Sequence, residues 1–202
     1  MANRWRRGVV GFTMMLGLAG RAGAASPPSV AVVAFDQAGI DAGVLARAKT
    51  EIARIYGEAG VSVRWIEPAA LESSEAFTIQ LLLRRRPVNG STSIMGTAIG
   101  DVHEARGSAF VFYDRVLVSA HQEHQDVARV LAYAMAHEMG HLLLPPAAHS
   151  PSGIMRADRD GNDLRRIGNG SLQFTDAQAS AMRVKASGCC ATSPSNEAGA
   201  ER

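Results

Sequence analysis

Hydrophobic residues in the first half of the chain form short apolar runs and one segment of helical periodicity. Val30–Phe35 is a run of mostly branched apolar residues, which predicts a strand. Over residues 41–59 apolar side chains recur at helical spacing and glycines mark the end, which predicts a helix. Two later runs, Val61–Ile66 and Phe77–Leu83, predict further strands. A strand, a helix and more strands are typical of an α/β unit.

The second half of the chain has weaker strand signals and two helical segments. Met95–Gly100 predicts a short edge strand, and Ala109–Tyr113 predicts a firmer one. Apolar and small residues over about 125–144 predict a long helix. It ends before Pro145 and Pro146 because proline removes a backbone donor and disfavours helical geometry in the preceding residue. The rest is a polar loop over residues 147–171 and a helix from Thr175 to Ala186, opened by a capping box with Gln178.

Residues 1–24 have the layout of a secretory signal peptide. Arginines precede an apolar run from Val9 to about Gly20, and small residues follow it. The run is about a dozen residues long, against the roughly 20 that a membrane-crossing helix needs. An uncleaved anchor stays open as the alternative, because glycines make the run only moderately apolar. We expect a cleaved signal, no membrane attachment after its removal, and a secreted or extracytoplasmic location.

Net charge changes once the signal is set aside. The whole chain carries +2, but residues 1–24 hold four arginines and no acidic residue, so the remainder carries −2. No basic face for nucleic acid is left, and Arg84–Arg86 is interpreted as a solvated strand end or loop. The length suits one domain over residues 25–188, followed by a disordered tail over residues 189–202. We expect a monomer.

The strongest chemical signal is the sequence HEMGH at residues 137–141. On a helix, residues four apart share a face, so His137 and His141 can reach one metal ion while Glu138 lies beside it as a candidate general base. The alternative is a pair of packed or solvated histidines. Apolar residues precede the motif, and burying charged groups on so apolar a helix costs free energy unless they serve a purpose. The pattern therefore favours a zinc site.

A catalytic zinc takes three protein ligands and leaves the fourth position to water. His149 is the best third ligand, because it follows the prolines that end the helix, where the reversing chain can return to the metal. Asp158 and Asp160 are the reserve ligands.

The stretch HEMGHLLLPPAAHSPSGIM, residues 137–155, resembles the metzincin clan of zinc endopeptidases, and within it the matrix-metalloprotease-like branch. The resemblance implies an α/β (α+β) zincin with a mixed, mostly parallel twisted sheet, an antiparallel edge strand, a zinc helix, a Met-turn and a C-terminal helix. It implies His149 as third ligand and Met155 as the methionine beneath the metal. It also implies a secreted endopeptidase that holds one Zn²⁺ and hydrolyses peptides or proteins by a zinc-activated water, with Glu138 as general base.

The spacing departs from the usual pattern of that clan. The clan has a glycine six residues after the first histidine and the third histidine ten residues after it. Here those positions hold Leu143 and Ala147, and His149 comes two residues late. The turn after the helix must therefore be built differently, through the two prolines. For Met155, a core methionine filling an irregular gap is the alternative, although its place after a Ser, Pro and Gly stretch favours the Met-turn.

Several other residues have possible roles that the pattern leaves open. His121 and His124 have a spacing that could hold a second metal, but a solvated helix start is the plainer interpretation. Tyr133 lies one turn before the motif and either approaches the metal face or packs in the core. The adjacent Cys189 and Cys190 predict no internal disulfide, and leave free thiols or intermolecular pairing.

Two further classes of function stay open beside the endopeptidase. A zinc hydrolase can act on a non-peptide amide or ester, because ligands alone do not fix the substrate. A non-catalytic zinc-binding module on the same fold is the other class, and the intact Glu138 argues against it. For a peptidase, we expect an extended substrate to add itself as a strand along Met95–Gly100.

Overall fold

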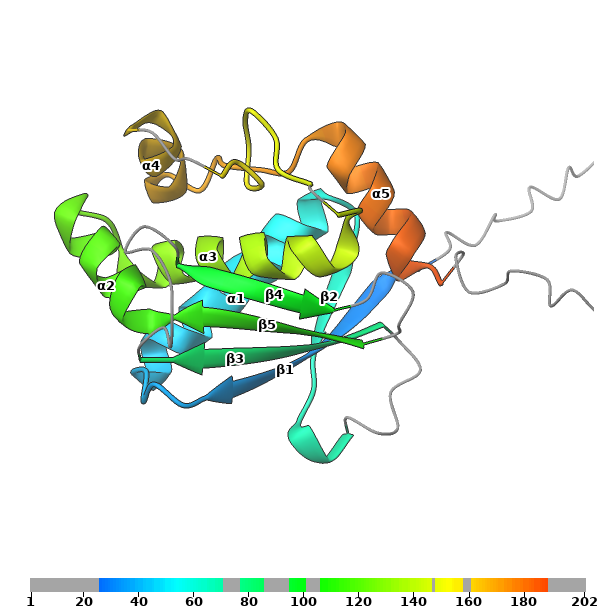
Figure 1. Cartoon of the computed structure of the whole chain (residues 1–202), viewed down its shortest axis with the longest axis horizontal. Helices are drawn as coiled ribbons and strands as arrows, with labels where there is room; N and C mark the ends of the chain where they lie inside the picture. The colour runs from blue at the N-terminus through cyan, green and yellow to red at the C-terminus, as the bar shows by residue number, and fades with distance from the viewer. Residues whose placement is uncertain are drawn as a thin grey trace, which may run out of the picture.

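The computed structural model places five strands and five α-helices within the described part of the chain (Figure 1). The described residues are 26–70, 77–85, 95–100, 106–146, 148–157 and 161–188. The predicted signal, the C-terminal tail with its two cysteines, and the reserve ligands Asp158 and Asp160 lie outside them. In chain order the elements are β1 (Ser29–Asp36), α1 (Ala42–Glu58), β2 (Ser62–Trp65), the 3₁₀ turn η1 (Pro68–Ala70), β3 (Phe77–Arg84), β4 (Gly96–Gly100), β5 (Arg106–Phe112), α2 (Tyr113–Gln122), α3 (Val127–Leu143), α4 (Gly161–Gly168) and α5 (Asp176–Ala186).

The strands form one mixed sheet in the order β2-β1-β3-β5-β4. The pairs β1–β2, β1–β3 and β3–β5 are parallel, whereas β4 pairs with β5 in the antiparallel sense and ends the sheet. The register places Val32 beside Ile79, and Leu81 beside Ala109, so one face carries a continuous set of apolar side chains. The predicted α/β fold with a mostly parallel sheet and an antiparallel edge strand is confirmed.

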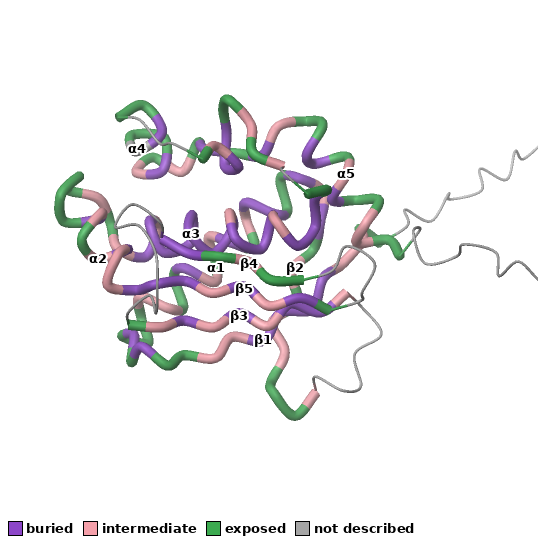
Figure 2. The backbone as a smooth tube through the Cα atoms, in the orientation of Figure 1, coloured by how far each residue is buried: buried purple, intermediate pink, exposed green. Residues whose placement is uncertain are grey.

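Helices α1 and α3 pack side by side over the apolar face of the sheet (Figure 1). Figure 2 shows the buried backbone concentrated in α3 and in the strands that it covers. Val30, Val32, Ile79 and Leu81 are fully buried on this face, which they share because alternate side chains of a strand point to the same side. The core lies between this face and the two helices. No helix within the described ranges is long and apolar enough to cross a membrane.

Helix α2, which precedes α3, is absent from the elements that the sequence predicts. Strand β5 ends at Phe112 and α2 begins at once, with Tyr113, Val116 and Ala120 buried on one face. That helical spacing overlaps the end of the strand's apolar run, so the two signals merge. His121 therefore lies in the last turn of α2 and not at the start of the helix that follows, which begins at Val127.

A second missed helix is α4, inside the stretch predicted as a polar loop. It has glycine at both ends and arginines along its exposed side, which is typical of a loop. Asp163 and Ile167 are nevertheless buried, at i and i+4. The final helix agrees closely with prediction: Thr175 is the N-cap of α5, and its capping box with Gln178 is formed in both directions.

Candidate metal centre

Helix α3 is a rigid and almost wholly buried platform. It begins where the Asp126 carboxylate accepts the backbone N–H of Arg129 at 3.1 Å. It ends at Leu144, whose φ of −113° and ψ of 159° are extended, as the residue before a proline requires. Among its buried residues are Leu131, Met135 and Met139. Burial on nearly all sides fixes the helix, and hence the relative positions of any two side chains one turn apart.

Three histidines meet at the C-terminal end of this helix. The Nε2 atoms of His137 and His141 are 3.2 Å apart. The ring centroid of His149 lies 4.8 Å from that of His141 and 5.5 Å from that of His137. One nitrogen from each ring lies within 4.8 Å of the others. The structure thus brings the two helix histidines and the later third histidine to a single point.

The donor set suits a zinc ion. Zinc–nitrogen bonds of about 2.0–2.1 Å in a tetrahedron place two ligand nitrogens about 3.3 Å apart. The Nε2–Nε2 separation of His137 and His141, 3.2 Å, is close to that value. The His137 Nδ1 lies 2.8 Å from the Ile154 carbonyl oxygen, which only accepts, so Nδ1 carries the proton and Nε2 keeps its lone pair for a metal. Burial, and after it the nearby His149, lowers the pKa of His141, which favours the neutral ligand form.

The backbone of Ile154 is tied on both sides. Its carbonyl accepts the hydroxyl of Tyr133 at 3.0 Å as well as the His137 ring N–H. Its N–H donates to the carbonyl of Gln173 at 3.0 Å. Tyr133 is buried, so it is a packed core residue that holds the Ile154 carbonyl in place. An oriented carbonyl of this kind fixes the ring and tautomer of a ligating histidine.

Met155 lies directly beneath the zinc helix. It is fully buried, and a Cβ added to Gly140 would lie 2.5 Å from its sulfur. The turn before it requires glycine: Gly153 has φ +80°, and a Cβ there would lie 2.6 Å from the Gln173 carbonyl oxygen. Two glycines therefore allow the methionine to approach the helix under the histidines.

Glu138 lies between the zinc helix and the edge strand β4. It is 6% exposed, and a Cβ added to Gly96 would lie 2.5 Å from its Cγ and 2.7 Å from its Cδ. The same Cβ would lie 2.5 Å from the Phe110 carbonyl oxygen of β5, so only a glycine at the start of β4 leaves room both for its partner strand and for the carboxylate side chain. The sequence interpretation treats Gly96 merely as part of an edge strand, and no local motif marks its contact with a residue 42 positions later.

The chain segment that carries His149 is held from α5. The amide nitrogen of Gln178 donates to the Ala148 carbonyl at 3.3 Å and to the Ser150 hydroxyl at 3.0 Å. The backbone N–H of Ser150 donates to the Met155 carbonyl at 3.0 Å, which closes the segment onto the turn below the metal centre. The sequence identifies Gln178 only as a capping residue.

The other histidines of interest stay apart from this centre. His121 is exposed, and its ring nitrogen lies 2.7 Å from the Leu117 carbonyl of its own helix. His124 follows in the turn after α2, with φ 53°. Within the described residues, the sole group of three or more metal-binding side chains is the histidine cluster on α3 and the segment after it.

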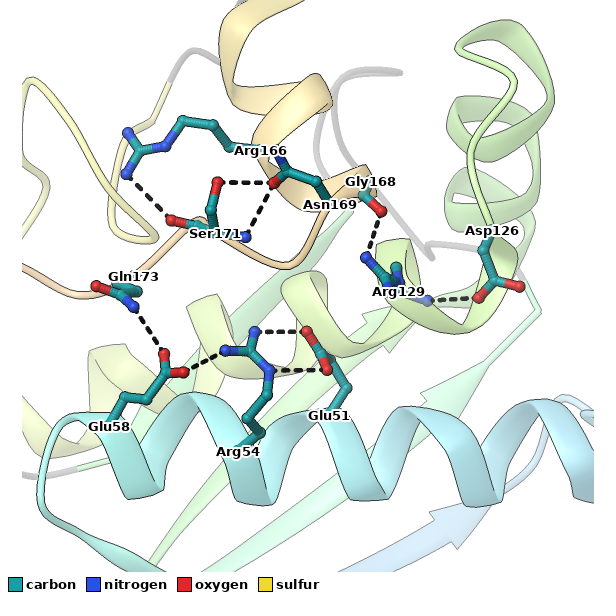
Figure 3. A network of polar contacts seen from close by, with 10 residues as sticks. All are labelled: Glu51, Arg54, Glu58, Asp126, Arg129, Arg166, Gly168, Asn169, Ser171 and Gln173. Carbon is teal, nitrogen blue, oxygen red and sulfur yellow. Dashed lines mark hydrogen bonds and ion pairs between the residues drawn. The ribbon is translucent and has the colours of Figure 1, made fainter.

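A polar network supports the site from the side of α1 (Figure 3). The Arg54 guanidinium contacts both carboxylate oxygens of Glu51, at 2.6 and 3.0 Å, and one oxygen of Glu58, at 2.5 Å. The hydrogen bond from Arg54 lowers the pKa of Glu51. Glu58 also accepts from the side chain of Gln173 at 2.9 Å. The network thus links α1 to the residue whose carbonyl holds Ile154.

Comparison with known proteins gives several solved structures with a similar chain path, of which two follow. A zinc-dependent peptidase from Methanocorpusculum labreanum matches over 76% of this chain and 99% of its own, with 13% identity and a TM-score of 0.49. An archaemetzincin from Methanopyrus kandleri matches over 80% of this chain and 96% of its own, with 15% identity and a TM-score of 0.48. No family model and no curated protein matches. At such identities and TM-scores the likeness carries no conclusion about activity, which must be inferred from the residues of this chain.

Proposed function

We propose that the chain is a zinc-dependent peptidase whose metal is held by His137, His141 and His149. The observation that carries the proposal is the convergence of three ring nitrogens within 4.8 Å of one another, beside a buried carboxylate. A zinc ion held there supplies Lewis acidity, which brings the pKa of water towards about 7 and stabilises negative charge on a carbonyl oxygen.

In this proposal Glu138 accepts the proton of the attacking water and passes it to the departing amine. Its position suits that role, because it follows a ligand on the helix and reaches the edge strand at Gly96. Burial of its side chain removes competing water and strengthens its interaction with a nearby cation. We propose that the carboxylate acts between the metal ligands and the strand along which a substrate would be held.

The same geometry favours an extended peptide as substrate, cleaved internally. Strand β4 ends the sheet, and its partner β5 occupies one edge only. A peptide can add itself along the other edge through backbone hydrogen bonds, which are independent of its sequence. We propose an endopeptidase, and the finer likeness to the matrix-metalloprotease-like branch stays a prediction.

Digestion of an unfolded protein substrate, with and without a zinc chelator, tests this function. We expect cleavage that a chelator abolishes and added zinc restores. Glu138→Gln, which keeps the shape next to Gly96, should retain zinc and lower the rate by about 10²–10⁴-fold. Full activity in that variant, or hydrolysis of amides or esters but of no peptide, would contradict the proposal. Bound zinc with no hydrolysis at all would indicate a binding module.

Location outside the cytoplasm is a separate proposal that rests on residues 1–24 alone. Expression in cells followed by fractionation and mass measurement of the mature N-terminus would test it. A full-length chain retained in the cytoplasm would contradict it.

A further inference from the structure

The start of α5 contacts the chain on both sides of the third histidine. Gln178 is 9% exposed, and its amide nitrogen donates to the carbonyl of Ala148 and the hydroxyl of Ser150. These residues immediately precede and follow His149. One buried side chain therefore bridges the segment that presents the third imidazole.

The orientation of the Gln178 amide follows from its partners. Its Oε1 accepts the backbone N–H of Thr175 at 3.0 Å, a group that only donates. Its nitrogen faces the Ala148 carbonyl, which only accepts. A flipped amide would break both contacts. The oxygen thus serves the helix cap and the nitrogen serves the histidine segment, so the two roles can be separated by substitution.

His149 needs such support more than the other two histidines. His137 and His141 are half-buried on a rigid helix, whereas His149 is exposed and lies beyond the two prolines that end the helix. An exposed ligand outside regular structure is in place before the metal arrives only if its backbone is fixed. The side chain of Gln178 ties the backbone around His149 to α5, and the N–H of Ser150 ties it to the turn at Met155.

We propose that Gln178 is a positioning residue of the metal centre, which holds the His149 segment so that the third imidazole meets the pair on α3. The inference rests on the proposed zinc site and extends it to a residue outside the histidine motif. It also explains how a third histidine that comes two residues late can reach the metal without the glycine of the usual turn.

Two substitutions separate positioning from capping. Gln178→Glu keeps an oxygen for the Thr175 N–H, because glutamate is equally suited to a capping box, but it removes the amide donor. Thr175→Ala removes the hydroxyl that accepts the backbone N–H of Gln178 at 3.3 Å. It leaves the side-chain amide donor of Gln178 in place. The measurement is zinc affinity of the metal-free full chain, by competition with a chromophoric chelator, beside the thermal midpoint of the same samples.

We expect Gln178→Glu to weaken zinc binding by about 10–100-fold, the range typical of residues that orient a metal ligand. Thr175→Ala should lower the Tm of the metal-free chain by about 2–4 °C and change zinc affinity by less than about twofold. Equal zinc affinities in both variants, whether lowered or unchanged, would show that Gln178 acts only as a cap and would overturn the inference.

Ser150→Ala approaches the same contact from the other side and serves if Gln178→Glu does not fold. It removes one acceptor of the Gln178 amide and should weaken zinc binding in the same direction. Unchanged binding in every one of these variants that folds would overturn the positioning role alone. A chain of unaltered sequence that takes up no zinc would overturn the proposed function as well, so the two failures are distinguishable.

Discussion

The metal side of α3 and the outer face of α1 are built in different ways. Towards the metal, buried groups meet at close van der Waals distance, as Gly140 does with Met155 and Glu138 does with Gly96. On the outer face of α1, by contrast, the contacts are ion pairs within that helix between half-exposed side chains, with Arg54 35% and Glu58 38% exposed. Close-packed groups cannot move apart without losing their contacts, whereas half-exposed ion pairs exchange with water at little cost. We therefore expect substitutions on the metal side of α3 to have large effects, and substitutions in the network on α1 to have small ones.

The largest effect should come from removing a ligand on the metal side. His141→Ala takes away one of the three convergent imidazoles, so zinc content measured by mass spectrometry should fall from about one per chain to near zero. The matched control is His121→Ala, an exposed histidine at the end of α2, which should bind zinc as the unaltered chain does. Equal loss in both variants would contradict the assigned centre.

The next effect should have opposite signs on the two sides. Gly140→Ala places a methyl group 2.5 Å from the Met155 sulfur, and such overpacking should lower the free energy of unfolding by about 1–3 kcal/mol. Gly57→Ala lies in α1, where a Cβ meets nothing within 4 Å, and should raise it by up to about 1 kcal/mol. Urea unfolding of the metal-free chains measures both. A change of the same sign in the free energy of unfolding of both variants would contradict the difference between the two regions.

A smaller effect should appear in catalysis without any loss of metal. Gly96→Ala crowds the Glu138 side chain and the Phe110 carbonyl oxygen of β5, so we expect kcat to fall by about tenfold, equivalent to about 1.4 kcal/mol, with zinc content unchanged. Gly100→Ala in the same strand has as its nearest contact a methyl of Leu142 at 2.9 Å, which can shift. Its kcat should stay within about twofold of the unaltered value. An equal loss of kcat in the two variants would point to damage of the strand as a whole.

The smallest effect should come from the network. Hydrogen bonding to Arg54 lowers the pKa of Glu51 from its ordinary 4.5, so its stabilisation is present above that value and is lost as pH falls through the lowered pKa. Glu51→Gln should cost about 0.2–1 kcal/mol at neutral pH and remove part of the decline in stability below pH 5. Urea unfolding from pH 7 to 4 measures it. A loss as large as that of Gly140→Ala would contradict the comparison.

Local pattern predicts most of the fold because the decisive signals are themselves local. The apolar run of β1, the periodicity of α1 and the proline pair after α3 act within a few residues, and each element lies close to its predicted bounds. Helices α2 and α4 are missed because their signals are short and mixed with others. The helical spacing from Tyr113 merges with the strand before it, and α4 carries glycine and arginine on its exposed side.

The residues of the metal centre also fall into two groups, those that the sequence predicts and those that it does not. The spacing of His137, Glu138 and His141 on one helix is visible in the sequence, since residues one turn apart must share a face. The contacts of Gly96 and Gln178 are not visible, because they join segments far apart along the chain. Nothing at either position differs locally from an ordinary edge-strand glycine or capping glutamine. Contacts of this kind depend on tertiary packing, which periodicity does not encode.

The contact between α5 and the His149 segment has a consequence for biosynthesis. The helix pair of histidines leaves the ribosome well before the segment with Gln178, because α5 is the last described element of the chain. A chain without α5 thus presents the two imidazoles of α3, while the segment that carries His149 lacks its hydrogen bonds to Gln178. The affinity for metal should rise only once α5 has been synthesised and has packed against the His149 segment, so a shorter nascent polypeptide would lack the complete metal centre.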